Sequence, residues 1–218
     1  GIVFDVGAHT GSVTELFYKN GSKVFAFEPD KINRDILSSK FENAKNVHID
    51  SRAIADSPKE NLPFYKSGQS SGISGLSAFH KSHKQSGTVN TTTISHVLEE
   101  LNINHIDFLK IDTEGYDFFV LKGVPWERCS PELILCEFED FKTKPLGYKW
   151  EEIAQLLERN GYKIIVSEWY PIKQYGARHK WRKFSPWPCT LEDKNAWGNL
   201  IATKNEETWH KLKTLTVT

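Results

Sequence analysis

The sequence lacks the features that mark secreted and membrane-spanning proteins. Its three cysteines (Cys129, Cys136 and Cys189) are odd in number and show no CxxC spacing, which excludes a disulfide framework and a zinc knuckle. No apolar run approaches the roughly 18 to 20 residues that span a bilayer, and no basic-then-apolar leader is recognisable. We therefore expect a soluble, cytoplasmic protein with no membrane span.

An excess of charge of one sign is also missing. Lysine plus arginine equals aspartate plus glutamate at 28 each, so we expect no nucleic-acid partner. A length of 218 residues suits one substantial core and is short for two, so we predict a single domain over residues 1–218. An expected buried strand at Ile2 has nothing upstream to cover it, which favours a trimmed piece of a longer chain. The oligomeric state stays open.

Strand and helix patterns alternate along the chain. This alternation predicts an α/β fold with a mainly parallel, seven-stranded sheet and helices on both faces. The expected strands cover residues 2–6, 23–27, 47–49, 108–111, 133–138, 163–166 and 200–203. Apolar residues at helical spacing predict helices after the first strand (Val13, Leu16, Phe17), after Asp30 (Ile32, Ile36, Leu37, Phe41) and from Trp150 to Gly161. We interpret their apolar stripes as core.

Two segments interrupt the alternation. Residues 67–85 are rich in serine, glycine, histidine and lysine, and residues 169–197 mix aromatic, basic and proline residues, so both are interpreted as long loops. Loops of this length in a compact domain are usually functional or disordered. The aromatic segment, with Trp181 and Trp187, could stack on sugar faces and bind anionic groups, or it could form a small satellite core.

The strongest local signal is a strand that enters a glycine-spaced turn, residues 4–11, with the sequence FDVGAHTG. Gly7 and Gly11 let the backbone turn tightly and approach a ligand, whereas His9 replaces the middle glycine that a pyrophosphate needs. The turn fits a ligand with an amino-acid carboxylate facing its amides and an amino group near Asp5. On this basis Gly7→Val should abolish binding and largely preserve the fold. The alternative to ligand binding is that Gly7 and Gly11 are needed only for packing of the strand, turn and helix.

Carboxylates follow two further strands. Glu28 and Pro29 end the second strand about 20 positions past the first glycines, where an acidic residue binds a ribose diol, which indicates an adenosine-containing cofactor. Asp112 and Glu114 end the fourth strand in the sequence LKIDTEG. The carboxyl ends of parallel strands lie at the same edge of a sheet. We therefore expect Asp112 and Glu114 to face the same crevice as Asp5 and Glu28. The alternative is a helix start with a carboxylate at its positive end.

With these motifs assembled, the sequence resembles the FkbM family of methyltransferases. The matching residues are Asp5-Val6-Gly7-Ala8 with Gly11 and Thr14, Phe27-Glu28-Pro29, Lys110-Ile111-Asp112-Thr113-Glu114-Gly115 and Val120-Leu121-Lys122-Gly123. The Ser71-Gly72 loop and an expected strand over Val89-Asn90-Thr91-Thr92-Thr93-Ile94 stand where that family has a serine-rich loop and its lead into a helix. The resemblance covers about the first 125 residues and implies a Rossmann-like class I methyltransferase fold, S-adenosylmethionine as cofactor and O-methylation of sugar or polyketide hydroxyls. Ser95 stands where the family usually has aspartate, and the sequence beyond Trp169 matches nothing that we can place.

The residues expected to bind the cofactor are Asp5, Gly7, Ala8, His9, Gly11, Glu28, Pro29 and Asp112. Methyl transfer to oxygen is an in-line displacement, so the protein must position the acceptor and remove its proton. The expected catalytic residues are Asp112, Glu114 and Glu137, with His9 and His80 as further candidates for the base. The acidic strand end formed by Glu137, Glu139 and Asp140 could also hold magnesium, but we assign no metal ligand.

Two other functions stay open. An NAD-dependent oxidoreductase would use the same Glu28 contact, although His9 in the turn disfavours it. A non-catalytic binding module that keeps the fold is disfavoured by the intact glycines and carboxylates. We expect the acceptor, a small molecule or glycan, to lie between the strand end at Asp112 and the segment 169–197.

Overall fold

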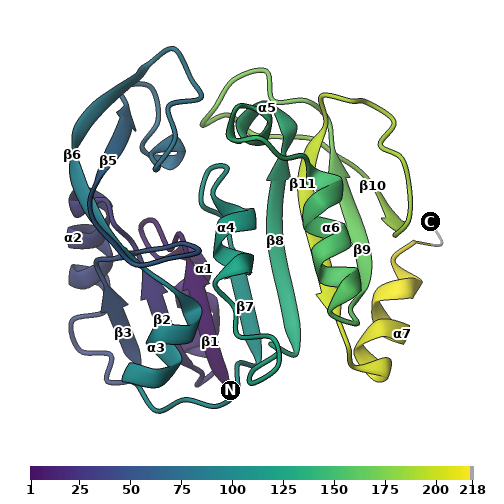
Figure 1. Cartoon of the computed structure of the whole chain (residues 1–218), viewed down its shortest axis with the longest axis horizontal. Helices are drawn as coiled ribbons and strands as arrows, with labels where there is room; N and C mark the ends of the chain where they lie inside the picture. The colour runs from purple at the N-terminus through teal and green to yellow at the C-terminus, as the bar shows by residue number, and fades with distance from the viewer. Residues whose placement is uncertain (217–218) are drawn as a thin grey trace.

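The computed structural model describes residues 1–216 and shows one large sheet with helices packed on it (Figure 1). The order of its strands is β10-β9-β11-β8-β7-β1-β2-β3. They are β1 (Ile2–Val6), β2 (Lys23–Phe27), β3 (Val47–Asp50), β7 (Phe108–Ile111), β8 (Leu133–Glu139), β9 (Lys163–Trp169), β10 (Trp181–Pro186) and β11 (Trp197–Thr203). All seven predicted strands lie in this sheet, and β10 adds an eighth at its edge.

The sheet is mainly parallel, as predicted. β1 pairs in parallel with both β2 and β7, and the parallel pairing continues to β3 on one side and β8 on the other. β11 is antiparallel to β8 and β9, and β10 is antiparallel to β9. The strand order therefore reverses between β1 and β7, which is the position where open α/β sheets bind ligands.

Helices cover both faces of the sheet. They are α1 (Ser12–Lys19), α2 (Lys31–Lys40), α3 (Ile94–Glu100), α4 (Asp117–Lys122), α5 (Asp140–Thr143), α6 (Trp150–Arg159) and α7 (Glu206–Thr214), with short 3-10 turns η1 (Ser71–Ile73) and η2 (Lys144–Leu146). Alternate residues of a strand point to opposite faces. Phe25 and Phe27 of β2 accordingly join the main core with α3, α4 and α6, whereas Ala26 packs with Leu37 and Phe41 on the side of α2.

The second helix begins where the sequence predicts. The side chain of Asp30 accepts a hydrogen bond from the backbone NH of Ile32 at 2.8 Å and caps α2. The predicted core stripe of this helix is only partly correct. Leu37 and Phe41 are buried, but Ile32 and Ile36 are 64% and 50% exposed.

The serine-rich segment 67–85 belongs to a β-hairpin. β5 (Lys59–Ser67) pairs antiparallel with β6 (His83–Thr92), and β4 (Ala53–Ile54) completes a three-stranded sheet. The predicted loop is therefore the hairpin tip together with the strand ends beside it. The hairpin rises above the edge at which the parallel strands end (Figure 1).

The segment 169–197 is not one long loop, because residues 181–186 form the edge strand β10. Trp187 is partly buried and packs edge-on against Trp150 with ring centroids 5.4 Å apart, so it joins the main core and forms no satellite core with Trp181. Trp181 is 39% exposed and contacts Phe184.

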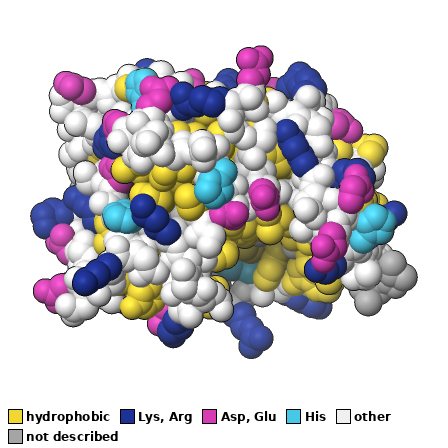
Figure 2. All heavy atoms as spheres, turned by 90° about the horizontal axis from the view of Figure 1, so that it is seen from below, with side chains coloured by type: hydrophobic (Ala, Val, Ile, Leu, Met, Phe, Trp, Pro, Cys, Tyr) yellow, Lys and Arg dark blue, Asp and Glu magenta, His cyan; other side chains and the backbone are white. Residues whose placement is uncertain are grey.

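Charges of both signs are interspersed on the face from which the parallel strands start (Figure 2). Among residues 1–216, no helix combines the length and the apolar character needed to cross a membrane.

Candidate cofactor and methyl-transfer site

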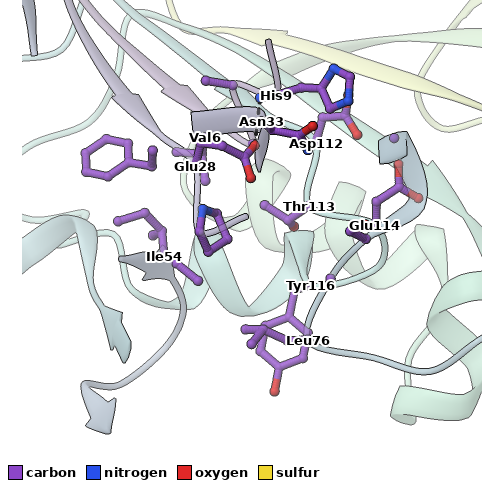
Figure 3. Close-up of a pocket in the computed structure, with 18 of the residues that line it drawn as sticks. Val6, His9, Glu28, Asn33, Ile54, Leu76, Asp112, Thr113, Glu114 and Tyr116 are labelled. Carbon is purple, nitrogen blue, oxygen red and sulfur yellow. Dashed lines mark hydrogen bonds between the residues drawn. The ribbon is translucent and has the colours of Figure 1, made fainter. Parts of the chain in front are cut away.

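A cavity of about 290 Å³ lies at the carboxyl edge of the sheet, at the reversal between β1 and β7. Its walls come from the turns after β1, β2 and β7, from the hairpin tip, and from strands β4 and β5. The polar and turn residues include Gly7, Ala8 and His9 after β1, Glu28 and Pro29 after β2, Ser71, Gly72, Ser74 and Gly75 in the hairpin tip, and Lys110, Asp112, Thr113 and Glu114 at the end of β7. In Figure 3, Glu28 and Glu114 lie on opposite sides of this space. The predicted gathering of the motifs at one edge is thus observed.

Glu28 is buried at the end of β2. Its Oε2 accepts a hydrogen bond from the backbone NH of His9 at 2.8 Å, and its Oε1 accepts one from the backbone NH of Asp30 at 2.7 Å. Burial raises the pKa of Glu28 to about 7, although both backbone donors act to lower it. Each carboxylate oxygen offers two lone pairs, so both oxygens keep acceptor capacity for a ligand.

The backbone amides of the turn do not point into the cavity as expected. The NH groups of Gly7 and Ala8 donate to the carbonyl oxygen of Phe27 at 3.0 and 3.1 Å, and the NH of His9 donates to Glu28. These donors join the turn to β2. The predicted contact between the turn amides and the ligand carboxylate is therefore wrong for these three residues.

Asp5 lies beneath the turn and is not among the residues that line the cavity. Its Oδ2 accepts a hydrogen bond from Oγ1 of Thr14 at 2.6 Å, and its Oδ1 lies 3.4 Å from Nζ of Lys110. Nζ of Lys110 also donates to the carbonyl oxygen of Gly7 at 2.7 Å. Asp5 therefore supports the turn through Lys110, a residue to which the sequence analysis gave no role.

Both glycines of the motif are required by packing. Gly7 has φ +81°, and a Cβ on it would lie 1.9 Å from the carbonyl oxygen of Asp112. Gly11 has φ +82°, and its Cβ would lie 2.5 Å from Leu37 and 2.8 Å from Phe41. A larger side chain at Gly7 therefore displaces the end of β7, so the expectation that Gly7→Val preserves the fold is wrong. Gly11 packs against α2 and is not among the residues that line the cavity, although Ser12 and Val13 after it are.

His9 connects the turn to the hairpin tip. Its Nε2 lies 3.0 Å from Oγ of Ser71, and its backbone takes a φ of +50°. Burial lowers the pKa of His9, which favours the neutral ring at physiological pH. Together these residues close one side of the cavity.

The three predicted catalytic carboxylates come together. One oxygen of each of Asp112, Glu114 and Glu137 lies within 4.8 Å of the others. Asp112 and Glu114 line the cavity, whereas Glu137 is buried behind them. The turn that carries Glu114 is held by Asp117, whose carboxylate accepts hydrogen bonds from the backbone NH groups of Thr113 and Gly115 at 2.9 and 3.1 Å.

A lysine that the sequence analysis did not consider stands among these carboxylates. Nζ of Lys142 lies 2.9 Å from Glu114, 2.9 Å from Glu137 and 3.2 Å from Glu139. Burial alone would lower the pKa of Lys142, but the three carboxylates outweigh it and raise that pKa well above its usual value. Burial raises the pKa of Glu114 to about 7, although the ammonium of Lys142 acts to lower it.

A second cavity, of about 470 Å³, adjoins this cluster. Its lining residues are Gln69, His80 and Lys81 of the hairpin tip, Glu139 and Phe141 at the end of β8, and Pro171, Ile172, Lys173, Gln174, Tyr175 and Asn195 of the segment 169–197. Glu139 accepts a hydrogen bond from the hydroxyl of Tyr175 at 3.3 Å. Because Lys142 bridges Glu114 in the first cavity and Glu139 in the second, the two spaces are neighbours.

Comparison with known proteins now identifies the family. Residues 5–164 match the methyltransferase FkbM domain. The chain belongs to the FkbM methyltransferase family. No curated protein matches the sequence. This FkbM chain is therefore an S-adenosylmethionine-dependent methyltransferase, and the predicted family and cofactor are confirmed.

Three solved methyltransferase structures are similar to this FkbM chain, and the first of them has the fold in common with it. The methyltransferase FkbM from Methylobacillus flagellatus KT has 16% sequence identity and a TM-score of 0.51, and the match covers 92% of this chain but only 42% of that one. A precorrin-6y C5,15-methyltransferase from Geobacter metallireducens GS-15 has 13% identity and a TM-score of 0.45, covering 94% of this chain and 79% of that one. An rRNA methylase from Streptococcus thermophilus has 11% identity and a TM-score of 0.47, covering 94% and 87%. The likeness to the FkbM structure from Methylobacillus flagellatus KT confirms the predicted class I methyltransferase fold.

Proposed function

We propose that this chain transfers a methyl group from S-adenosylmethionine to a hydroxyl oxygen of a sugar, a glycan or a related natural product. The observation that carries the proposal is the position of Asp112 and Glu114 on the wall of the first cavity, from which Lys142 connects Glu114 to Glu139 in the second. Bound S-adenosylmethionine supplies an activated methyl group on a sulfonium. The protein must then position a hydroxyl and accept its proton.

The residues of the first cavity fit the proposed cofactor. Glu28 offers two buried oxygens with acceptor capacity at the strand end where a ribose diol binds. The amino-acid part of the cofactor carries one charge of each sign, and the wall carries the ammonium of Lys110 3.6 Å from the carboxylate of Asp112. Phe27, Ile54 and Phe64 add apolar surface for the base.

Asp112 and Glu114 are the candidates for the general base. The side chain of Asp112 is 42% exposed, so it can reach a hydroxyl that enters from the open side. Burial gives Glu114 a pKa of about 7, close to the value that suits a base working at neutral pH. Glu137 lies behind them and contacts the site through Lys142.

The second cavity is the proposed site for the acceptor. It opens between the strand ends and the segment 169–197, where the acceptor is expected. Phe141 is 58% exposed and Tyr175 lies beside it in the lining, so the cavity offers apolar faces beside polar groups. Such a combination suits a sugar ring, which has an apolar face and a rim of hydroxyls. The free thiols at all three cysteines fit the proposed cytoplasmic location.

The test begins with titration calorimetry of the full chain against S-adenosylmethionine and NAD. We expect binding of the former only. Transfer of a radiolabelled methyl group is then screened over monosaccharides, oligosaccharides, polyketides and RNA, with the product analysed for an O-methyl group. Selective binding of NAD would favour an oxidoreductase, and binding of neither cofactor would favour a non-catalytic module. Methylated RNA as the product would contradict the proposed acceptor.

A further inference from the structure

Lys142 is among the most deeply buried side chains of the molecule, with 1% of its surface exposed. It belongs to α5, directly after β8, and its Nζ reaches carboxylates from three positions in the fold. Glu114 comes from the turn after β7, and Glu137 and Glu139 come from β8. Burial of a lysine ammonium is costly unless charged partners surround it, so this contact pattern indicates a fixed ammonium.

The aromatic surroundings of Lys142 shield it from water. The rings of Phe79 and Tyr175 lie 5.9 and 6.0 Å from Nζ, at the outer limit of a cation–π contact. The hydroxyl of Tyr175 donates to Glu139, one of the carboxylates that Lys142 contacts. The ammonium is thus enclosed by the hairpin tip on one side and by the segment 169–197 on the other.

The same carboxylates have the arrangement of a cation site. Oxygens of Asp112, Glu114 and Glu137 within 4.8 Å of one another would suit a hard divalent ion. The ammonium of Lys142, however, already contacts Glu114 and Glu137, at 2.9 Å each. A metal ion bound to those oxygens would lie close to a positive charge, which opposes its binding.

We propose that Lys142 is a positioning residue of the methyl-transfer site and that its ammonium takes the place of a divalent cation. It holds Glu114 at the wall of the first cavity and Glu139 at the wall of the second. The inference rests on the proposed function, because Glu114 is a candidate base there. It has the consequence that methyl transfer in this chain requires no divalent metal.

The test uses Mn²⁺ as a probe, followed by electron paramagnetic resonance in titrations of the full chain. We expect the wild type to leave Mn²⁺ free and Lys142→Met to bind it at least about tenfold more tightly, because the opposing charge is gone. Lys144→Met is the matched control. It removes a lysine two residues away whose side chain is 52% exposed and pairs with Asp140, and it should behave as the wild type.

A second measurement separates positioning from a merely structural role. With an identified acceptor, Lys142→Met should lower kcat about a hundredfold, the lower range for a misplaced general base, and change the Kd for S-adenosylmethionine less than about threefold. Lys142→Arg should recover part of kcat and should not bind Mn²⁺. EDTA should leave wild-type turnover unchanged.

Three results would overturn the inference. They are Mn²⁺ binding by the wild type that Glu137→Gln abolishes, wild-type turnover that EDTA abolishes, and a folded Lys142→Met protein with unchanged Mn²⁺ affinity and unchanged kcat. If Lys142→Met does not fold, the wild type, Lys142→Arg and Glu137→Gln decide the question. Absence of S-adenosylmethionine binding by the wild type would instead contradict the proposed function, whatever the result with Mn²⁺.

Discussion

The backbone NH of His9 donates a hydrogen bond to Oε2 of Glu28 at 2.8 Å. This bond ties the turn after β1 to the end of β2, and the other oxygen of Glu28 holds the backbone NH of Asp30 at the start of α2. The carboxylate proposed to bind the ribose therefore also fixes the shape of the cavity. Changes at Glu28 should affect the ligand contact and the turn together.

We predict that Glu28→Gln weakens binding of S-adenosylmethionine by about 1–3 kcal/mol, because a buried charged acceptor is replaced by a neutral amide. Titration calorimetry measures the effect. Glu127→Gln, the same change at an exposed position, is the control and should leave the affinity unchanged. Equal affinities of wild type and Glu28→Gln would show that the ribose lies elsewhere.

We also predict that the affinity for S-adenosylmethionine rises with pH. Burial raises the pKa of Glu28 to about 7, so the ligand-free protein is mostly protonated there at about pH 6 and mostly ionised at about pH 8. Ribose hydroxyls donate to the ionised form, and binding therefore releases the proton. The expected gain is about tenfold over these two pH units. It should disappear in Glu28→Gln, and a pH-independent affinity in the wild type would contradict it.

The raised pKa of Glu28 also affects stability. The folded protein keeps this proton above the usual glutamate pKa, whereas the unfolded chain has lost it. Stability contributed by the protonated form is present at low pH and declines as the pH rises from about 4.5 through about 7. Bound cofactor should reverse part of this decline, which thermal unfolding at several pH values can measure.

Local patterns in the sequence predicted the seven strands and the edge at which Glu28, Asp112 and Glu114 meet, because short apolar runs and strand ends are local features. The partners of these residues were not predicted. Lys142 follows Glu137 by five positions, but nothing in that spacing shows that its ammonium is buried among three carboxylates. In the sequence Lys110 is only one residue of the LKIDTEG motif, and its bond to the carbonyl oxygen of Gly7, 103 residues away, depends on strand pairing.

The β5–β6 hairpin shows a different limit of local patterns. β6 consists mostly of exposed polar residues, so it lacks the apolar alternation that marks a half-buried strand. Its pairing with β5 depends on tertiary contacts. The exposed Ile32 and Ile36 of α2 show the opposite case, in which helical spacing predicted core and the structure placed the side chains at the surface.

We predict that Gly7→Ala destabilises the protein far more than Gly21→Ala. Both glycines have φ near +80°, which costs an L residue about 1–2 kcal/mol. A Cβ at Gly21 meets nothing within 4 Å, whereas at Gly7 it would lie 1.9 Å from the carbonyl oxygen of Asp112, which adds about 1–3 kcal/mol or more. Denaturant unfolding of both variants compares the two free energies, and equal losses would rule out the clash.

Substitution of the two candidate bases should separate their roles. We predict that the true base, replaced by its amide in Asp112→Asn or Glu114→Gln, loses about a hundredfold to ten-thousandfold in kcat, a far larger change than the one in cofactor affinity. If Glu114 is the base, its pKa of about 7 requires the acidic limb of the rate profile to lie near neutral pH. Wild-type rates in both variants across the pH range would exclude both residues.

The aromatic residues of the segment 169–197 should divide into two classes. Trp187 is partly buried and packs against the core residue Trp150, so Trp187→Ala should cost about 1–3 kcal/mol of stability and leave the acceptor KM unchanged. Tyr175 lines the second cavity, and Tyr175→Phe removes only the hydroxyl that donates to Glu139. That variant should stay folded and raise the acceptor KM if the cavity binds the acceptor.

Trp181→Ala is the surface control, because Trp181 lies outside the lining of both cavities. Steady-state kinetics with an identified acceptor, together with thermal unfolding, distinguishes the classes. An unchanged KM in Tyr175→Phe and in Phe141→Ala would place the acceptor outside the second cavity, because both changes alter groups that line it directly.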